Sequence, residues 1–128
     1  MGTKHVLVVD DEPFIRRSLE FLLKKQGFRV TLASNGEEAV NVLQGEDLPE
    51  LMFLDVMMPK MNGFEVIETI RKDPRLNDIY VILLTAKGQE ADRKRGFDLG
   101  ANDFMIKPFS PSRLMEKVNE YFGQKAEA

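Results

Sequence analysis

Polar side chains follow four short apolar segments of this chain, at the point where each segment stops. These residues are Asp10, Asp11, Asp55, Thr85 and Lys107. If the segments are parallel strands, their carboxyl ends share one edge of a sheet, and open α/β sheets bind ligands outside that edge. Three carboxylates, a hydroxyl and an amine gathered there describe a site for a metal ion and a phosphoryl group.

The rest of the chain supplies the elements that such a sheet needs. Short β-rich segments are expected as strands at residues 4–9, 28–33, 51–54, 79–84 and 102–106. Helical patterns follow each of them, beginning near Pro13, Gly36, Gly63, Gln89 and Pro111. Five strands alternating with five helices predict an α/β fold, a doubly wound parallel sheet with right-handed crossovers.

Length and composition predict one ordinary globular domain. The 128 residues suffice to bury a core, and we expect residues 1–123 to form the domain and residues 124–128 a polar tail. The net charge of -3 gives no footprint for nucleic acid, and no apolar stretch reaches the roughly 18 residues of a membrane span. We therefore expect that this chain binds neither nucleic acid nor a membrane directly. The absence of cysteine suits a cytoplasmic protein.

Four motifs, in order and on the expected strand ends, carry a family resemblance. They are Val8-Val9-Asp10-Asp11-Glu12, Asp55-Val56-Met57-Met58-Pro59-Lys60-Met61-Asn62-Gly63, Leu84-Thr85-Ala86 and Lys107-Pro108-Phe109. From Lys4 to about Phe122 the chain resembles the receiver domain of two-component response regulators, of the chemotaxis-regulator type. The resemblance implies a flavodoxin-like (βα)5 fold with strand order 2-1-3-4-5.

The resemblance also implies a role for each polar residue. Asp55 would accept a phosphoryl group from a phosphohistidine on a sensor histidine kinase or a phosphotransfer protein. Asp10, Asp11, Asp55 and the main-chain carbonyl of Met57 would hold a divalent cation. Lys107, in a cis peptide bond with Pro108, would contact the phosphoryl oxygens, and Thr85 would hydrogen-bond one of them.

Elementary chemistry supports these roles independently. A carboxylate can accept a phosphoryl group as an acyl phosphate, but each pair of unit charges 4 Å apart costs roughly 4 kcal/mol at an effective dielectric near 20. A divalent ion removes that repulsion, and Lys107 adds a fixed positive charge. A site with few carboxylate ligands, in which water fills the other coordination positions, favours Mg²⁺ over Ca²⁺. We expect that Mn²⁺ can also bind there.

Several positions have plainer alternatives. For Asp10 and Asp11 taken alone, capping of the next helix is an equal alternative, and Thr85 could be an ordinary strand former. Three methionines, Met57, Met58 and Met61, could suggest a soft-metal site, but packing or partner contacts fit the hard oxygen ligands nearby better. We expect no metal or catalytic role for His5.

Other residues are expected to regulate the site. The family places at Phe104 an aromatic that turns inward when Thr85 shifts, with a plain core aromatic as the alternative. We expect Met57 and Lys87 to tune hydrolysis by shielding or admitting water. Gly96, inside the helix at 89–99, costs roughly 1 kcal/mol against Ala, and our hypothesis is that it loosens this helix.

The expected function is therefore a signalling switch with slow self-dephosphorylation rather than an enzyme. Phosphorylation would change the surface formed by the fourth helix, fifth strand and fifth helix, and so control an effector protein or an output domain. The chain would be a monomer or a phosphorylation-dependent dimer. A hydrolase or phosphotransferase would need a general acid or base, and the single histidine stands at the wrong end of its strand. A flavin-binding protein would want a phosphate-cradling loop where this chain has Asp10 and Asp11.

Overall fold

Strands and helices alternate throughout residues 4–127, which the computed structural model describes. The strands are His5–Val9 (β1), Arg29–Ala33 (β2), Leu51–Asp55 (β3), Tyr80–Ala86 (β4) and Asp103–Lys107 (β5). The helices are Pro13–Lys25 (α1), Gly36–Leu43 (α2), Gly63–Lys72 (α3), Glu90–Leu99 (α4) and Pro111–Glu127 (α5). The predicted element order is confirmed.

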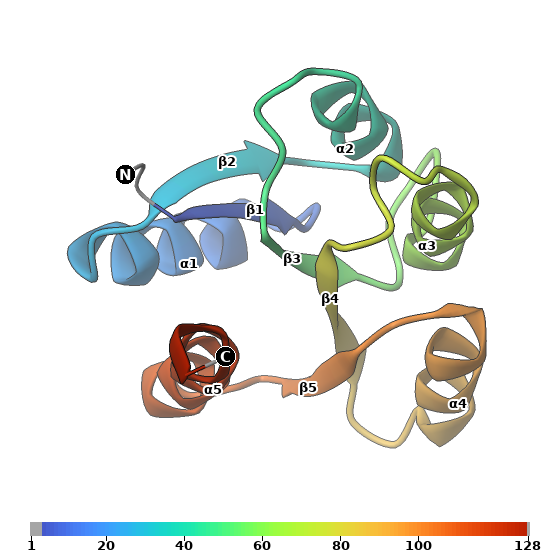
Figure 1. Cartoon of the computed structure of the whole chain (residues 1–128). Coiled ribbons are helices and arrows are strands. Elements are labelled where there is room, and N and C mark those ends of the chain that lie inside the picture. Colours follow the sequence, from blue (N-terminus) through green and yellow to red (C-terminus); the bar gives the residue numbers. More distant parts are fainter. Residues whose placement is uncertain (1–3, 128) are drawn as a thin grey trace.

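The five strands form one parallel sheet in the order β2-β1-β3-β4-β5. In Figure 1, α1 and α5 cover one face of this sheet, and α2, α3 and α4 cover the other. The doubly wound, flavodoxin-like fold with strand order 2-1-3-4-5 is thus confirmed. All five carboxyl ends lie along one edge, which is the edge where the polar residues were expected to meet.

The sheet has a buried core on each face, because successive side chains of a strand point to opposite sides. On the face covered by α2, α3 and α4, the core contains Leu7, Val9, Met52, Leu54, Val81, Leu83, Ala39, Leu43, Val66, Ile67 and Ile70. On the face covered by α1 and α5, it contains Val6, Val8, Leu51, Phe53, Ile82, Leu84, Leu19, Leu23, Leu114 and Val118. These two cores explain why the strands are apolar at consecutive positions.

Helix α4 packs closely although it carries few apolar side chains. Gly96 is its buried residue, and a Cβ at this position would collide with the Leu83 side chain. The glycine thus lets the helix backbone approach β4. This contact gives Gly96 a packing role that our flexibility hypothesis did not consider.

Helix α5 is longer than expected. Its backbone continues to Glu127, whereas residues 124–128 were expected as a tail. Gln, Lys, Ala and Glu all favour helix over coil, which explains the extension. The domain boundary after residue 123 stays a prediction, and residue 128 lies outside the described residues. Among residues 4–127, no helix combines the length and the apolarity that crossing a membrane requires.

Candidate functional site

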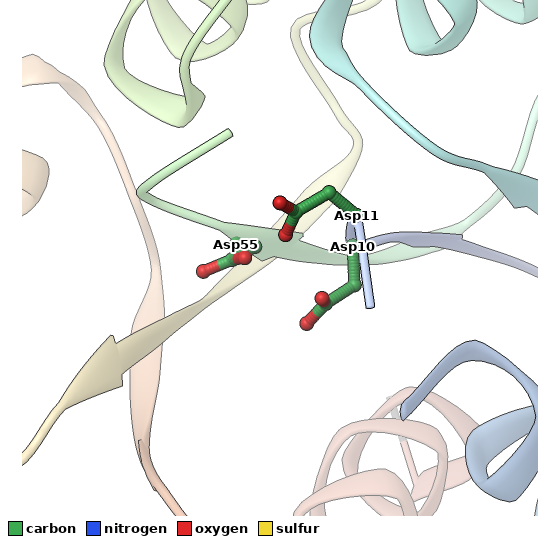
Figure 2. Close-up of side chains that lie close together, drawn as sticks. All are labelled: Asp10, Asp11 and Asp55. Atoms are coloured by element: carbon green, nitrogen blue, oxygen red, sulfur yellow. The ribbon is translucent and has the colours of Figure 1, made fainter. Parts of the chain in front are cut away.

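Three carboxylates meet at the carboxyl ends of β1 and β3. One oxygen each from Asp10, Asp11 and Asp55 lies within 4.8 Å of the other two. Figure 2 shows these side chains together, two from the segment after β1 and one from the end of β3. Asp10 and Asp55 are buried, with 0% and 6% of their surface exposed, whereas Asp11 is exposed. Carboxylates this close in a low-dielectric site repel one another strongly, so the cluster needs positive charge.

Backbone contacts hold Asp10 in place. Its N–H donates to the carbonyl of Ala33 at 3.1 Å, which extends the pairing of β1 with β2. Its Oδ1 accepts from the N–H of Glu12 at 2.9 Å, and Arg16 donates to its carbonyl at 2.7 Å. The N-cap residue of α1 is Glu12 rather than either aspartate. Helix capping therefore does not account for Asp10.

Asp55 is the last residue of β3, and a close loop follows it. Gly63 donates its N–H to the carbonyl of Val56 at 3.0 Å, and a Cβ on Gly63 would lie 2.5 Å from the carbonyl oxygen of Asp55. Asn62 and Glu65 form a capping box that starts α3 there. The glycine thus permits the start of α3 to come back against Asp55, which closes the loop at 57–62.

The Lys107 ammonium group supplies positive charge to this cluster. Lys107 Nζ lies 2.9 Å from Asp10 Oδ2 and 3.3 Å from Asp55 Oδ2, and it donates a hydrogen bond to Glu12 Oε1 at 3.2 Å. The Lys107 side chain is only 17% exposed, and its peptide bond to Pro108 is cis, as expected. It reaches the acids from the end of β5.

The electrostatics of the site follow from burial and from these charges. Burial raises the pKa of Asp55 to about 7, and the charge of Asp10 adds to this effect while Lys107 opposes it. Burial alone would lower the pKa of Lys107, but Asp10, Asp55 and Glu12 outweigh it and raise that pKa above its ordinary value. One cation therefore only partly compensates the acids.

The donor set fits a hard divalent cation. Carboxylate oxygens are the preferred ligands of such ions. Asp10 Oδ2 is buried, and among the described residues its one polar partner is the Lys107 ammonium, 2.9 Å away. A carboxylate oxygen has room for a further partner, which coordination to an ion would supply.

A cavity of about 630 Å³ opens over the acids. Its lining includes Asp11, Glu12, Asp55, Met57, Lys107 and two residues around the start of α4, Gln89 and Asp92. The cavity therefore gives a molecule from solvent access to Asp55 and Lys107.

A comparison with protein families agrees with this geometry. The family model described as response regulator receiver domain matches residues 6–119. The chain belongs to this family. The matched range begins at the second residue of β1, covers the other four strands whole and includes the three acids. The chain is thus a receiver domain of two-component systems.

Relatives of this receiver include named transcriptional regulators. The receiver is 49% identical over 118 residues to the "Probable transcriptional regulator ycf27" of Cyanophora paradoxa, covering 92% of this chain and 48% of the relative. It is 40% identical over 115 residues to the phosphate regulon transcriptional regulatory protein PhoB of Klebsiella pneumoniae, covering 90% and 50%. This chain thus spans about half the length of such curated relatives.

Solved structures share the fold of this receiver. A putative response regulator from Chloroflexus aurantiacus superposes with a TM-score of 0.87 at 32% identity, covering 93% of this chain and 97% of that one. The chemotaxis protein CheY4 of Vibrio cholerae superposes with a TM-score of 0.86 at 28% identity, covering 93% and 98%.

Thr85 lies in the receiver's β4 but outside the lining of the cavity. Its hydroxyl is buried and makes a long 3.5 Å hydrogen bond to the carbonyl of Met105 on β5. By strand alternation the Thr85 side chain shares a face with Leu83, on the side of α4. The structure therefore brings together the acids and Lys107, but it turns the Thr85 hydroxyl toward β5.

Phe104 lies partly buried on that same face of the sheet. The Phe97 ring meets it edge-on with centroids 5.9 Å apart, and the Arg93 guanidinium carbon lies 4.9 Å from the Phe104 centroid. Both partners belong to α4. The side chain that the family resemblance links to switching is thus in contact with the helix expected to respond.

The remaining expected residues lie in different settings. Met57 is 72% exposed and lines the cavity, whereas Lys87 is exposed in the turn after β4 and is not part of the lining. Met58 and Met61 pack against the core, which agrees with a packing role. His5 lies at the other end of β1, with Nε2 2.7 Å from Thr31 Oγ1.

Sequence reasoning missed Glu12 and Asp92 as members of the site. Glu12 was named only within the first family motif, yet its side chain contacts Lys107. Asp92 was given no role, yet it lines the cavity. The third acid after β1 was the available signal for Glu12, but spacing along the chain could not show its partner.

Proposed function

We propose that this receiver accepts a phosphoryl group on Asp55 and works as a phosphorylation-dependent signalling switch. The observation that carries the proposal is the buried Asp55 carboxylate, which faces an open cavity beside two further acids and one ammonium. The donor is a phosphohistidine on a sensor histidine kinase or on a phosphotransfer protein. Membership of the receiver family supports this assignment.

The transfer balances without a further reactant. An oxygen of the Asp55 carboxylate forms a bond to phosphorus, and the bond between phosphorus and the donor histidine nitrogen breaks. The imidazole leaves with the electron pair. Asp55 must be ionised to attack, and Lys107 favours its ionised form because an adjacent positive charge lowers the pKa of a carboxyl group. Slow attack of water on the acyl phosphate returns free Asp55 and phosphate.

Asp10, Asp11 and Asp55, with the main-chain carbonyl of Met57, are the residues that would hold Mg²⁺, and Mn²⁺ would also serve. When bound, the ion supplies charge neutralisation for the acids and for the transferring oxygens. Asp10 and Asp11 stay unmodified in this proposal, because their role is to hold the metal ion beside Asp55.

Thr85 and Phe104 form the switch in this proposal. The Thr85 hydroxyl leaves the carbonyl of Met105 to bind a phosphoryl oxygen, and the Phe104 ring moves into the space that Thr85 vacates. Because Phe104 contacts Arg93 and Phe97, its movement alters α4 and the adjoining surface of β5 and α5. That surface then controls the partner.

The partner on the output side is a downstream effector protein or an output domain. The relatives named as transcriptional regulators are about twice as long as this chain, which supports an output domain in proteins of that kind. We propose a cytoplasmic protein, without direct nucleic-acid binding by this receiver, that is a monomer or a phosphorylation-dependent dimer.

Met57 and Lys87 tune the lifetime of the phosphorylated state. Met57 supports this role best, because it lies exposed at the cavity where a water would approach. Lys87 would have to reach in from the turn after β4. No observation favours turnover of phosphate esters as a second function, since the single histidine lies at the far end of β1.

One incubation tests the proposal. The receiver is treated with acetyl phosphate and Mg²⁺, and intact mass is measured for wild type, Asp55→Asn and Asp78→Asn. Asp78 is an exposed carboxylate in the segment before β4, at the opposite end of the sheet. We expect one added phosphoryl group in wild type and in Asp78→Asn, and none in Asp55→Asn. A wild-type chain that stays unlabelled under conditions that label another receiver contradicts the proposal.

A further inference from the structure

The Glu12 side chain contacts the Lys107 ammonium, although its position at the start of α1 suggests a helix-capping role. It is the N-cap residue of α1, where an acidic side chain ordinarily accepts a hydrogen bond from a free backbone N–H. Its side chain makes no such bond. Instead Glu12 Oε1 accepts a hydrogen bond from Lys107 Nζ at 3.2 Å. A helix-capping role therefore does not explain this side chain.

The three carboxylates around Lys107 differ in burial. Lys107 Nζ lies 2.9 Å from Asp10 Oδ2 and 3.3 Å from Asp55 Oδ2, and both of these carboxylates are buried. Glu12 Oε1 lies 3.2 Å from the same nitrogen, but the Glu12 side chain is 60% exposed. Of the three, Glu12 can therefore leave Lys107 at the least cost, because water solvates a carboxylate that is already mostly exposed.

A phosphoryl group on Asp55 needs the same ammonium. Its oxygens are strong acceptors and carry negative charge, while Glu12 lines the cavity through which they arrive. Lys107 has three N–H donors, and it already faces three carboxylates. A contact has to be given up before a phosphoryl oxygen can be bound.

We propose that Glu12 is a positioning residue that holds Lys107 before transfer, and that the incoming phosphoryl group displaces it. This inference rests on the proposed function of Asp55. Glu12 keeps the ammonium in place over the acids, but its charge also opposes an anionic donor. Removing that charge should speed transfer rather than abolish it.

The test compares Glu12→Gln, Glu12→Asp and the remote control Glu46→Gln at saturating Mg²⁺. Glu46 is exposed and lies in the segment before β3, at the other end of the sheet, so its variant makes the same charge change elsewhere. The second-order rate of labelling by acetyl phosphate is measured by intact mass. Circular dichroism checks that each variant is folded.

We expect Glu12→Gln to be labelled about three- to tenfold faster than wild type at low salt, from the loss of one nearby repelling charge. High salt should reduce this difference in rate, because ions screen the repulsion between the exposed Glu12 carboxylate and the anionic donor. Glu12→Asp should also be faster than wild type, since its shorter side chain releases Lys107. Glu46→Gln should match wild type.

Three results would overturn the inference. The first is a Glu12→Gln rate equal to or below that of wild type. The second is a Glu12→Gln variant that is faster than wild type while Glu12→Asp only equals wild type. That result would mean that the charge of Glu12 matters and its contact with Lys107 does not. The third is an equal gain in Glu46→Gln. Failure of every chain to label, wild type included, would instead contradict the proposed function.

Discussion

Lys107 Nζ lies 3.3 Å from Asp55 Oδ2, although β4 separates the strands that carry the two residues. The lysine comes from the end of β5 and spans the end of β4 to reach the acids. Only a side chain with a long flexible stem can do this, which is a physical reason for lysine at this position. The contact couples the charge states of two residues far apart in the sequence.

Replacing Lys107 by Met should leave the acids without their compensating charge. We expect labelling of Asp55 by acetyl phosphate to fall by at least about tenfold, since one charge contact to a transferring group contributes more than about 1.4 kcal/mol in a site sheltered from water. Mass spectrometry of labelled protein measures this change. Lys72→Met, at an exposed position on α3, should label as wild type. Equal labelling of both variants would contradict a role for Lys107.

Metal-free protein should lose stability as the pH rises, because of Asp55. Its pKa is raised from 3.8 to about 7, so the folded state binds this proton more tightly than the unfolded state. As the pH rises from about 4 to about 7, the free energy of unfolding therefore falls by at most about 4 kcal/mol because of this group. Asp55→Asn should remove this loss and be more stable than wild type at pH 8.

Urea unfolding in EDTA at pH 5 and pH 8 measures this effect. The difference between Asp55→Asn and wild type should be larger at pH 8, and Asp78→Asn should show no such pH-dependent gain. If the wild-type and Asp55→Asn proteins responded equally to pH, desolvation of Asp55 would not govern the stability of the site.

Mg²⁺ should stabilise the folded protein, since the acids that bind it are close together only in the fold. At a free concentration one hundred times the dissociation constant, the expected gain in the free energy of unfolding is about 2.7 kcal/mol. Asp11→Asn should weaken this gain without unfolding the chain, because Asp11 is exposed. Urea midpoints across a Mg²⁺ titration measure it. A wild-type midpoint that did not move with Mg²⁺ would contradict the metal assignment.

Gly96→Ala should destabilise the protein although alanine favours helix. The added methyl group would meet the Leu83 side chain, and such overpacking costs about 1–3 kcal/mol. Gly123→Ala is the matched control, because Gly123 also lies within a helix, α5. A Cβ added there would have open space around it rather than a neighbouring side chain. That variant should be stabilised by up to about 1 kcal/mol. If both variants gained stability equally, helix propensity rather than packing would explain Gly96.

Arg93→Ala should free the Phe104 ring from α4. The guanidinium covers the ring at 4.9 Å, and such contacts contribute about 0.5–1 kcal/mol at partly exposed sites. We expect faster hydrogen exchange in β5 and α4. Arg95→Ala is the comparison, since Arg95 covers Phe64 on α3 instead. Equal exchange in β5 for both variants would argue against a specific contact between Arg93 and Phe104.

Much of the fold was predictable because burial repeats with the period of each element. Continuous apolar segments marked the strands, and apolar residues such as Leu19 and Leu23 at helical spacing marked the inner face of α1. Parallel strands then required the acids after β1 and β3 to share an edge. The sequence by itself therefore determined the layered architecture and the edge of the sheet at which the acids gather.

The tertiary structure alone decided which of these residues touch, and through which atoms. Sequence spacing could not show that Glu12 turns from its helix to Lys107, or that the Thr85 hydroxyl faces the Met105 carbonyl on β5. The close approach of α4 that requires Gly96 was equally hidden. Periodicity reports only which side of an element is buried. Side-chain partners depend on strand register and on residues far away in the chain, which come together only when the sheet and its helices pack.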